Sequence, residues 1–387
     1  MTYRRAAIPA LAGGLLLMAL LWWAGASAHA LYLPGTPNVI GSVDAAELQR
    51  WFTPWSHDLP ASVQFGNEVS GGNGDAASAD GVPYLALFAT AVQIRFGAVF
   101  VFFGLGALFL LRRLPPVHGR MPAALLAVWA WGLVAGTLAV TVSAPWLMAS
   151  RGHGGFRLLP QLAGVISSGR QVLVLTALVA AVVTVCLARV TAKGAGPLPQ
   201  AVVPARAARL AATVGTAVIA LSLVVLSYQS VAAALQMVSP SVGLLSEPGD
   251  LLRQWLLLGG WDGPGGAPLG DWLLYRAADG LLLVVVWWAL RRLPGLFTRA
   301  TVPAMAVGAV CATVLGLLAS QLLRMALNGA GLDWDLLRLA AGIGEGVPAA
   351  LTCGLVAGVA AAVTLRVAGG RAGNADAAPS VQGPARS

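Results

Sequence analysis

The sequence predicts an all-α integral membrane protein. Its eight transmembrane helices are expected to form two tandem four-helix repeats in parallel orientation, with extracytoplasmic amphipathic helices. Three observations support this fold class. The composition is 58% hydrophobic and only 10% charged, whereas soluble domains carry about 25% charged residues. Apolar runs recur at about 20 residues, the length that crosses a bilayer as a helix. The pentapeptide Leu-Arg-Arg-Leu-Pro occurs at 111–115 and again at 290–294, each time between two apolar runs.

Eight runs have the length, apolar character and scarcity of charge that a transmembrane helix requires. They are expected at Ala6–Ala28, Tyr84 or Phe88 to Leu111, Met121–Ala144, Gln171–Ala188, Leu210–Val238, Trp272–Leu290, Pro303–Leu323 and Gly346–Leu365. The small residues that end the first run, before His29, also fit a secretory signal peptide. We expect this helix to be retained, because its counterpart in the repeat is the internal fifth run.

The segments between these runs predict surface elements. Amphipathic stretches are expected at Ser42–Trp55, Asp250–Trp261 and Leu332–Ile343, and a short apolar segment at Phe156–Ile166. In the first stretch, Asp44 and Glu47 have capping-box spacing, and its aromatic residues fall on one helical face. The predicted domains are a first repeat at 1–193 with a flexible outer loop at 66–81, a cytoplasmic Pro-rich linker at 194–208, a second repeat at 209–366, and a disordered cytoplasmic tail at 367–387.

Basic residues predict the orientation. Pairs such as Arg4-Arg5, Arg112-Arg113 and Arg291-Arg292 all fall on one side of an eight-helix arrangement. Because lysine and arginine mark cytoplasmic segments, both termini are expected in the cytoplasm, and the protein in the plasma membrane. The net charge of +9 comes from these short clusters at helix ends, so we expect the lipid bilayer and no nucleic acid as a partner.

The two halves of the chain also resemble one another outside the basic turns. Ala30–Trp51 and Ala234–Trp255 align without gaps and share five identical positions, including the terminal tryptophans. Further along, Met148-Ala149 matches Met325-Ala326. Four helices per unit give both copies the same orientation, as in parallel-repeat transporters. The sequence therefore predicts a head-to-tail duplication.

Charged residues inside the apolar runs are the first candidates for a substrate site. Arg95 and Arg276 stand at near-equivalent positions before the two basic turns, and Asp279 lies one helical turn after Arg276. A carboxylate within a membrane helix is costly unless it is paired or faces water, so it is a functional hypothesis. The alternative is a structural Arg276–Asp279 pair. For Arg170, Arg324 and Glu345, at outer helix ends, interfacial snorkelling is the expected role.

Polar residues in the fifth run are the second candidates. Tyr228 and Gln229 lie within the run Ser-Tyr-Gln-Ser at 227–230, which covers every face of one helical turn. Some of these side chains must therefore contact protein or water. A polar cavity wall is the functional interpretation, and hydrogen bonds between helices are the alternative.

Small residues at spacing four form a third pattern, at Gly132 and Gly136 in the third run and at Ala312 and Gly316 in the seventh. Such faces allow close helix approach. They suggest a seam between the third and seventh helices, with packing inside one half as the alternative.

No cofactor and no metal site is expected. The four histidines, His29, His57, His118 and His153, lack ligand spacing, and the three cysteines lie inside apolar runs. Phosphate-binding and hydrolase motifs are missing from the sequence, which disfavours an enzyme. We therefore expect a permease-like transport protein or an accessory subunit of an envelope complex, with a membrane protein partner in the latter case. The alternative is a membrane enzyme acting at the outer face on an anionic, lipid-linked substrate.

Overall fold

The chain is a multi-pass membrane protein built from helices. The computed structural model describes residues 3–32, 39, 41–57, 81–116, 119–150, 158–192, 204–226, 228–237, 248–258, 269–327 and 344–376. Every regular element within these residues is a helix, and eight of the helices are long and apolar enough to cross a membrane. The predicted all-α membrane class and the eight predicted spans are confirmed.

The spanning helices are α1 (Tyr3–Ser27), α5 (Gly81–Arg113), α6 (Met121–Ala149), α8 (Arg170–Thr191), α9 (Ala205–Leu221) continued by the π-helical η4 (Ser222–Leu226), α12 (Leu269–Leu296), α13 (Val302–Leu327) and α15 (Val347–Asp376). Shorter helices connect them: η1 (Ala28–Tyr32), α3 (Ser42–Phe52), η2 (Thr53–Trp55), α7 (Leu158–Ser167), α10 (Gln229–Gln236) and α11 (Gly249–Leu256). The amphipathic stretch expected at Leu332–Ile343 lies outside the described residues, as do nearly all of the predicted loop at 66–81 and most of the linker at 194–208.

Several predicted helix boundaries differ from the structure, two of them more than the others. The fifth run was expected to be one helix to Val238, but the α-helix ends at Leu221, continues as the π-helical η4, and restarts as α10 after Tyr228. The break falls at the polar run 227–230, where side chains on every face of a turn prevent continuous apolar packing. At the other boundary, α15 continues to Asp376, past the expected helix end at Leu365 and into the segment 367–387 that was predicted to be disordered. The first proline beyond it, Pro379, lies outside the described residues.

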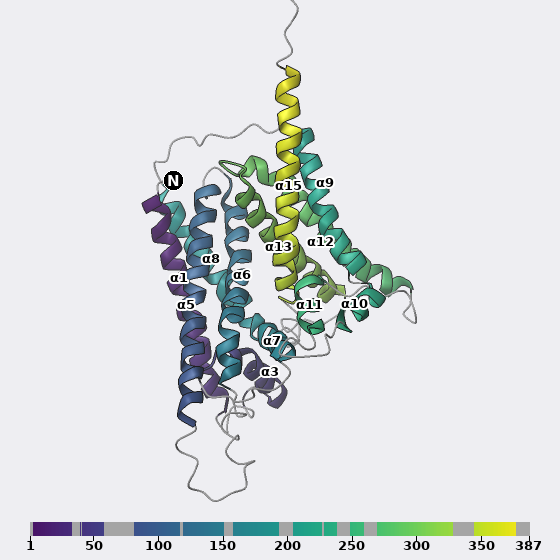
Figure 1. The fold of residues 1–387 in the computed structure, drawn as a ribbon. Coiled ribbons are helices and arrows are strands. Elements are labelled where there is room, and N and C mark those ends of the chain that lie inside the picture. Colours follow the sequence, from purple (N-terminus) through teal and green to yellow (C-terminus); the bar gives the residue numbers. More distant parts are fainter. Residues whose placement is uncertain are drawn as a thin grey trace, which may run out of the picture.

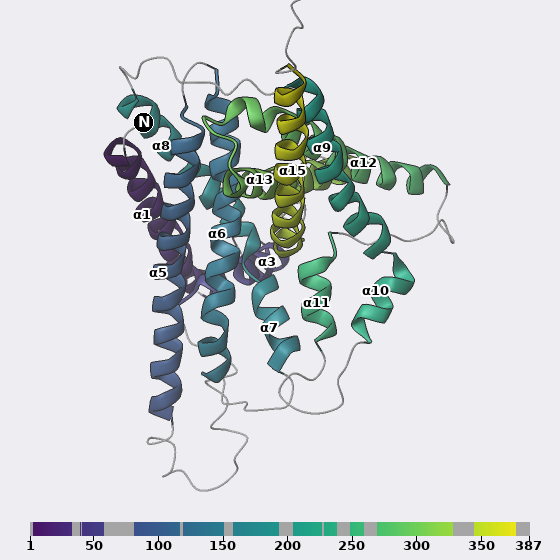
Figure 2. The same cartoon turned by 45° about the horizontal axis from the view of Figure 1, so that its top comes forward.

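The helices form two four-helix groups with the same neighbours. In the first half (residues 3–192), α1 and α6 each pack against both α5 and α8. In the second half (residues 204–376), α9 and α13 each pack against both α12 and α15. Figures 1 and 2 show the two groups side by side, the first from purple to teal and the second from teal-green to yellow.

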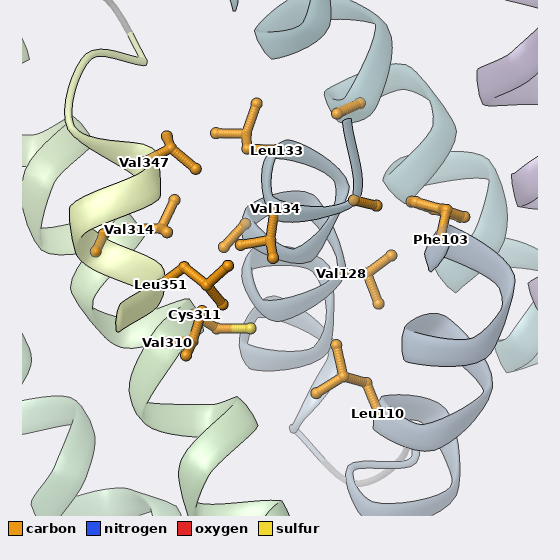
Figure 3. Packing of buried hydrophobic residues seen from close by; sticks show 14 of the residues in the cluster. Phe103, Leu110, Val128, Leu133, Val134, Val310, Cys311, Val314, Val347 and Leu351 are labelled. Atoms are coloured by element: carbon orange, nitrogen blue, oxygen red, sulfur yellow. The ribbon is translucent and has the colours of Figure 1, made fainter. Parts of the chain in front are cut away.

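The halves meet along α6, which packs against α13 and α15. Figure 3 shows the buried side chains gathered there, among them Val134 of α6, Val310 and Val314 of α13, and Leu351 of α15. The thiol of Cys311 donates a hydrogen bond to the carbonyl of Ala127 across this contact, with an S–O distance of 3.4 Å. We call this contact the seam.

The glycine faces predicted to form the seam pack elsewhere. A Cβ atom added to Gly132 would lie 2.7 Å from Ala177, and one added to Gly136 would lie 2.2 Å from Leu173, both on α8. A Cβ on Gly316 would meet Leu282 of α12. The third and seventh spans therefore do touch, but through aliphatic side chains, while these glycines bring helices together inside each half.

The two basic segments that were predicted to be turns lie at one end of the bundle and touch each other. Only the first is a turn, because residues 290–294 are helical and belong to α12. The backbone N–H of Thr298, after the second segment, donates to the carbonyl of Arg113 in the first, at 3.0 Å. The start of α1 and the end of α15 lie at the same end (Figure 1). We call it the basic end; α7 and α11 lie toward the opposite end.

Candidate functional site

A cavity of about 740 Å³ lies between the two halves, toward the end opposite the basic turns. Its walls come from α7 and α8 of the first half, from η4, α11, α12 and α13 of the second half, and from the segment before α15. Six of the lining residues carry charge: Arg170, Arg253, Arg324, Asp250, Asp279 and Glu345. The charged groups thus come from both halves and converge on one space.

Asp279 is the buried centre of a three-residue ion cluster. Its side chain is only 5% exposed and pairs with Arg276 on the same helix, at 2.9 Å, and with Arg324 of α13. Spacing of three residues places Arg276 and Asp279 on one face of α12, which makes the first pair local. Two guanidinium groups around one carboxylate leave the cluster with a net positive charge. Arg324, 32% exposed, carries that charge to the cavity.

A second ion pair crosses between the halves. Arg170, at the first position of α8, lies 3.8 Å from Glu345 in the segment before α15. Gln321 of α13 holds that segment, because its side chain donates to the Glu345 carbonyl and accepts from the Gly344 N–H, each at 3.0 Å. Glu345 is 64% exposed, so water screens this pair strongly.

The helix α11 covers the cavity and is fastened on both sides. The hydroxyl of Ser222 in η4 donates to the Leu256 carbonyl at 2.8 Å, and the Thr352 hydroxyl of α15 donates to the Trp255 carbonyl. These bonds satisfy carbonyls that a helix C-terminus otherwise leaves unpaired. With its amide oriented to satisfy both groups, Gln254 donates to the Ala163 carbonyl and accepts from the Ser167 N–H of α7, each at 3.2 Å. Thus α11 belongs to the second half but also contacts the first.

Hydrogen-bond donors remain unused beside the cavity. The Nε–H groups of Arg170 and Arg324 are buried, and neither has an acceptor among the described residues. A buried, unpaired donor on a charged group costs free energy until an acceptor reaches it. Both residues line the cavity. Three carboxylates share the lining with three arginines, so the positive charge is local to the Asp279 cluster, where two guanidinium groups face one carboxylate.

Besides its charged residues, the cavity has a polar part, formed by Ser167, Gln254, Ser320 and Gln321, and an apolar part. Five buried leucines line it: Leu223, Leu257, Leu258, Leu282 and Leu317. Leucine surfaces favour hydrocarbon over water. The arrangement therefore suits a ligand that has an anionic group and an apolar body, and it is less suited to a fully hydrated inorganic ion.

The predicted site residues fall in three different places. Asp279 lines the cavity, and Arg276 supports it from behind through their ion pair. Arg95 is buried in the first half, away from the cavity lining, where its Nε–H donates to the Ser143 hydroxyl at 2.9 Å. Tyr228 and Gln229 are exposed beside the break that follows η4 and are not among the residues that line the cavity.

The cavity arginines were interpreted from sequence as interfacial. Arg170 and Arg324 were expected to snorkel toward headgroups, yet the structure turns both toward the space between the halves. Their one sequence signal is that each lies at the end of an apolar run. Arg253 and Gln254 were not predicted as site residues. They belong to an amphipathic stretch, and its sequence does not show which segment its polar face contacts.

The part of the chain that the structure describes contains no group of three side chains able to hold a metal ion. Comparisons of the chain with protein-family models, curated proteins and solved structures found no match. The functional argument therefore depends on the geometry of the cavity.

Proposed function

We propose that this protein is a permease-type carrier that moves amphipathic organic anions across the plasma membrane. The observation that carries the proposal is the cavity between the halves, where Arg170 and Arg324, each with a buried donor that lacks an acceptor, lie beside five buried leucines. Fixed guanidinium donors bind carboxylate or phosphate by charge-assisted hydrogen bonds. The leucines would hold the hydrocarbon part of the same molecule.

The seam supplies the other feature that a transport mechanism requires, a closed end. At the seam, aliphatic side chains pack the two halves together. Toward the end opposite the basic turns, the cavity separates them. A site between two halves, open at one end and closed at the other, is the arrangement that rocking of one half against the other would invert. In this state the carrier would receive its solute at the end opposite the basic turns.

We further propose that the halves are copies of one ancestral unit, both inserted with the basic end in the cytoplasm. Support comes from the shared neighbour pattern of the helices and from the two basic turns at one end. A glycine with positive φ also precedes the equivalent helices α8 and α15, Gly169 at 72° and Gly346 at 79°. The cavity would then open to the outside, and a lateral exit would reach the outer leaflet.

The orientation can be tested with enzymatic reporters fused after Pro115 and after Pro294. Because basic turns favour the cytoplasm, a cytoplasmic reporter is expected to be active at both positions and a periplasmic or extracellular reporter inactive. Fusions after Asp80 and Leu327 serve as controls and should give the opposite pattern. Opposite signals at the two prolines would rule out parallel copies.

The carrier hypothesis is tested with hexyl phosphate as the probe. Purified protein in nanodiscs is expected to bind it, and Arg170→Gln and Arg324→Gln should each raise Kd about tenfold. Loss of one charge-assisted hydrogen bond is worth about 1.5–3 kcal/mol, and 1.4 kcal/mol corresponds to tenfold. Isothermal titration calorimetry gives Kd, and uptake into proteoliposomes measures transport. Arg50→Gln, the same change on the exposed face of α3, is the matched control.

Three outcomes separate the candidate roles. Saturable uptake that both cavity variants reduce supports the carrier. Binding without uptake, together with chemical conversion of a lipid-linked phosphate, would support an outer-face enzyme. The observation that favours this second candidate is the presence of Asp250 and Glu345 in the same cavity, whose carboxylates would act as bases. Absence of binding in all variants would contradict both roles and leave an accessory subunit, for which a stable membrane protein partner should co-purify.

A further inference from the structure

A second cavity lies between α1 and α5, separate from the charged site. It measures about 650 Å³ and is lined by Met18, Ala19 and Trp22 of α1, by Phe88, Ala89, Val92, Gln93 and Phe96 of α5, and by His57. We call it the α1–α5 groove. Both helices are membrane spans. Trp22 of the lining is 54% exposed, and Trp23, the next residue on α1, is 66% exposed. The open side of the groove therefore faces lipid.

The depth of the groove follows from the length of α5. The span Leu85–Arg113 has 29 residues, about 43 Å at 1.5 Å per residue, whereas the hydrocarbon core is about 30 Å thick. A stretch of about 20 residues that ends at Leu111, next to the basic interface, begins at Val92. Gln93 thus lies where the hydrocarbon meets the headgroups of the opposite leaflet. Trp22 and Trp23 reach a similar level on α1, as expected of interfacial aromatic residues.

Gln93 is the unusual member of the lining. It is exposed on a lipid-facing helix, and no described residue makes a hydrogen bond with its amide. An amide at the edge of the hydrocarbon core is costly without a partner. The groove around it is aromatic. His57 contacts both helices, because its ring is stacked on Phe96 of α5 at 5.4 Å between ring centroids and tilted against Trp22 of α1 at 5.8 Å.

We propose that the α1–α5 groove binds a diacyl glycerophospholipid of the leaflet opposite the basic end. One acyl chain lies against Met18, Trp22 and Phe96, and the Gln93 amide donates to an ester carbonyl. Ester carbonyls occupy the depth at which Gln93 lies, and they supply the acceptor that the protein does not.

The test uses nanodiscs that contain phosphatidylcholine with a photoactivatable diazirine in the acyl chain. After irradiation, label is expected to concentrate on the peptides that carry residues 18–22 and 88–96. Gln93→Leu should lower labelling of these peptides about fivefold, which matches the loss of one hydrogen bond of about 1 kcal/mol. Thr90→Val is the matched control, because the exposed Thr90 hydroxyl donates within its own helix, to Ala86, and Thr90 lies outside the groove lining.

A second variant guards against an uninformative result. Ala19→Phe leaves Gln93 in place but fills the groove, so it should also lower labelling of the 88–96 peptide. Thermal melting of each variant in detergent shows that it is folded. Even labelling over all lipid-facing helices, or unchanged labelling in both variants, would overturn the proposal. So would protein–protein crosslinks through the groove, which would assign it to a second copy of the chain.

Discussion

Asp279→Asn is expected to lower the free energy of unfolding by about 3–5 kcal/mol, the usual cost of removing one partner from a buried ion pair. The carboxylate is 5% exposed and pairs with both Arg276 and Arg324. Its loss leaves Arg276, only 15% exposed, without its buried counter-charge. Unfolding by SDS in mixed micelles, followed by tryptophan fluorescence, measures the change.

The control for Asp279 is the same chemical change at another carboxylate of the cavity, Glu345. Glu345→Gln removes a partner of Arg170, but the pair is exposed and 3.8 Å long, so about 0–1 kcal/mol is expected. The two variants should also differ in binding. Asp279→Asn frees Arg324 from its ion pair and shifts its position, so the Kd for hexyl phosphate should change. Glu345→Gln removes a competing anion, so the Kd should stay the same or fall. Equal stability of both variants would show that the cluster is not a structural centre.

Hydropathy and charge predicted the spanning helices because both respond to the same solvent, the bilayer. Each helix must satisfy its backbone internally and bury its apolar surface in lipid or protein, so an apolar run of sufficient length has one stable conformation. The break after η4 shows where this reasoning ends. The run 227–230 was recognised as polar on every face, yet whether a helix tolerates such a turn depends on neighbouring contacts. Here the Ser222 hydroxyl bonds the end of α11 at the start of the π-helical segment.

The cavity could be predicted only in part, because it depends on contacts between distant segments. Asp279 was recognisable as a carboxylate within a span, and Arg276 as its neighbour on one helix face. Arg324 joins them from a helix 45 positions away, and Arg170 meets Glu345 only because the halves pack through the seam. Local sequence patterns do not encode such pairs. Snorkelling was therefore the reasonable expectation for each arginine taken alone.

Arg95 and Arg276 show that equivalent sequence positions need not share a role. Arg276 pairs with a carboxylate behind the cavity. Arg95 is 5% exposed and donates to the Ser143 hydroxyl and to the Pro54 carbonyl, with its guanidinium 5.9 Å from the centre of the Trp55 ring. Trp55 in turn donates to the Gly169 carbonyl before α8, at 2.9 Å. Arg95 therefore fastens η2 to α5 and α6 and supports the first half.

Arg95→Met is accordingly expected to cost about 2–4 kcal/mol in the free energy of unfolding, since hydrogen bonds from a charged group contribute about 1.5–3 kcal/mol and the Pro54 carbonyl would be left unpaired. Methionine keeps much of the side-chain volume, so the loss reflects the polar contacts. Arg95 does not line the cavity, so the Kd for hexyl phosphate should stay within about twofold. A tenfold change in Kd would require about 1.4 kcal/mol of lost binding free energy. SDS unfolding and calorimetry on the same preparation separate the two quantities. A stable variant with weakened binding would instead return Arg95 to the substrate-binding role that its position in the sequence predicts.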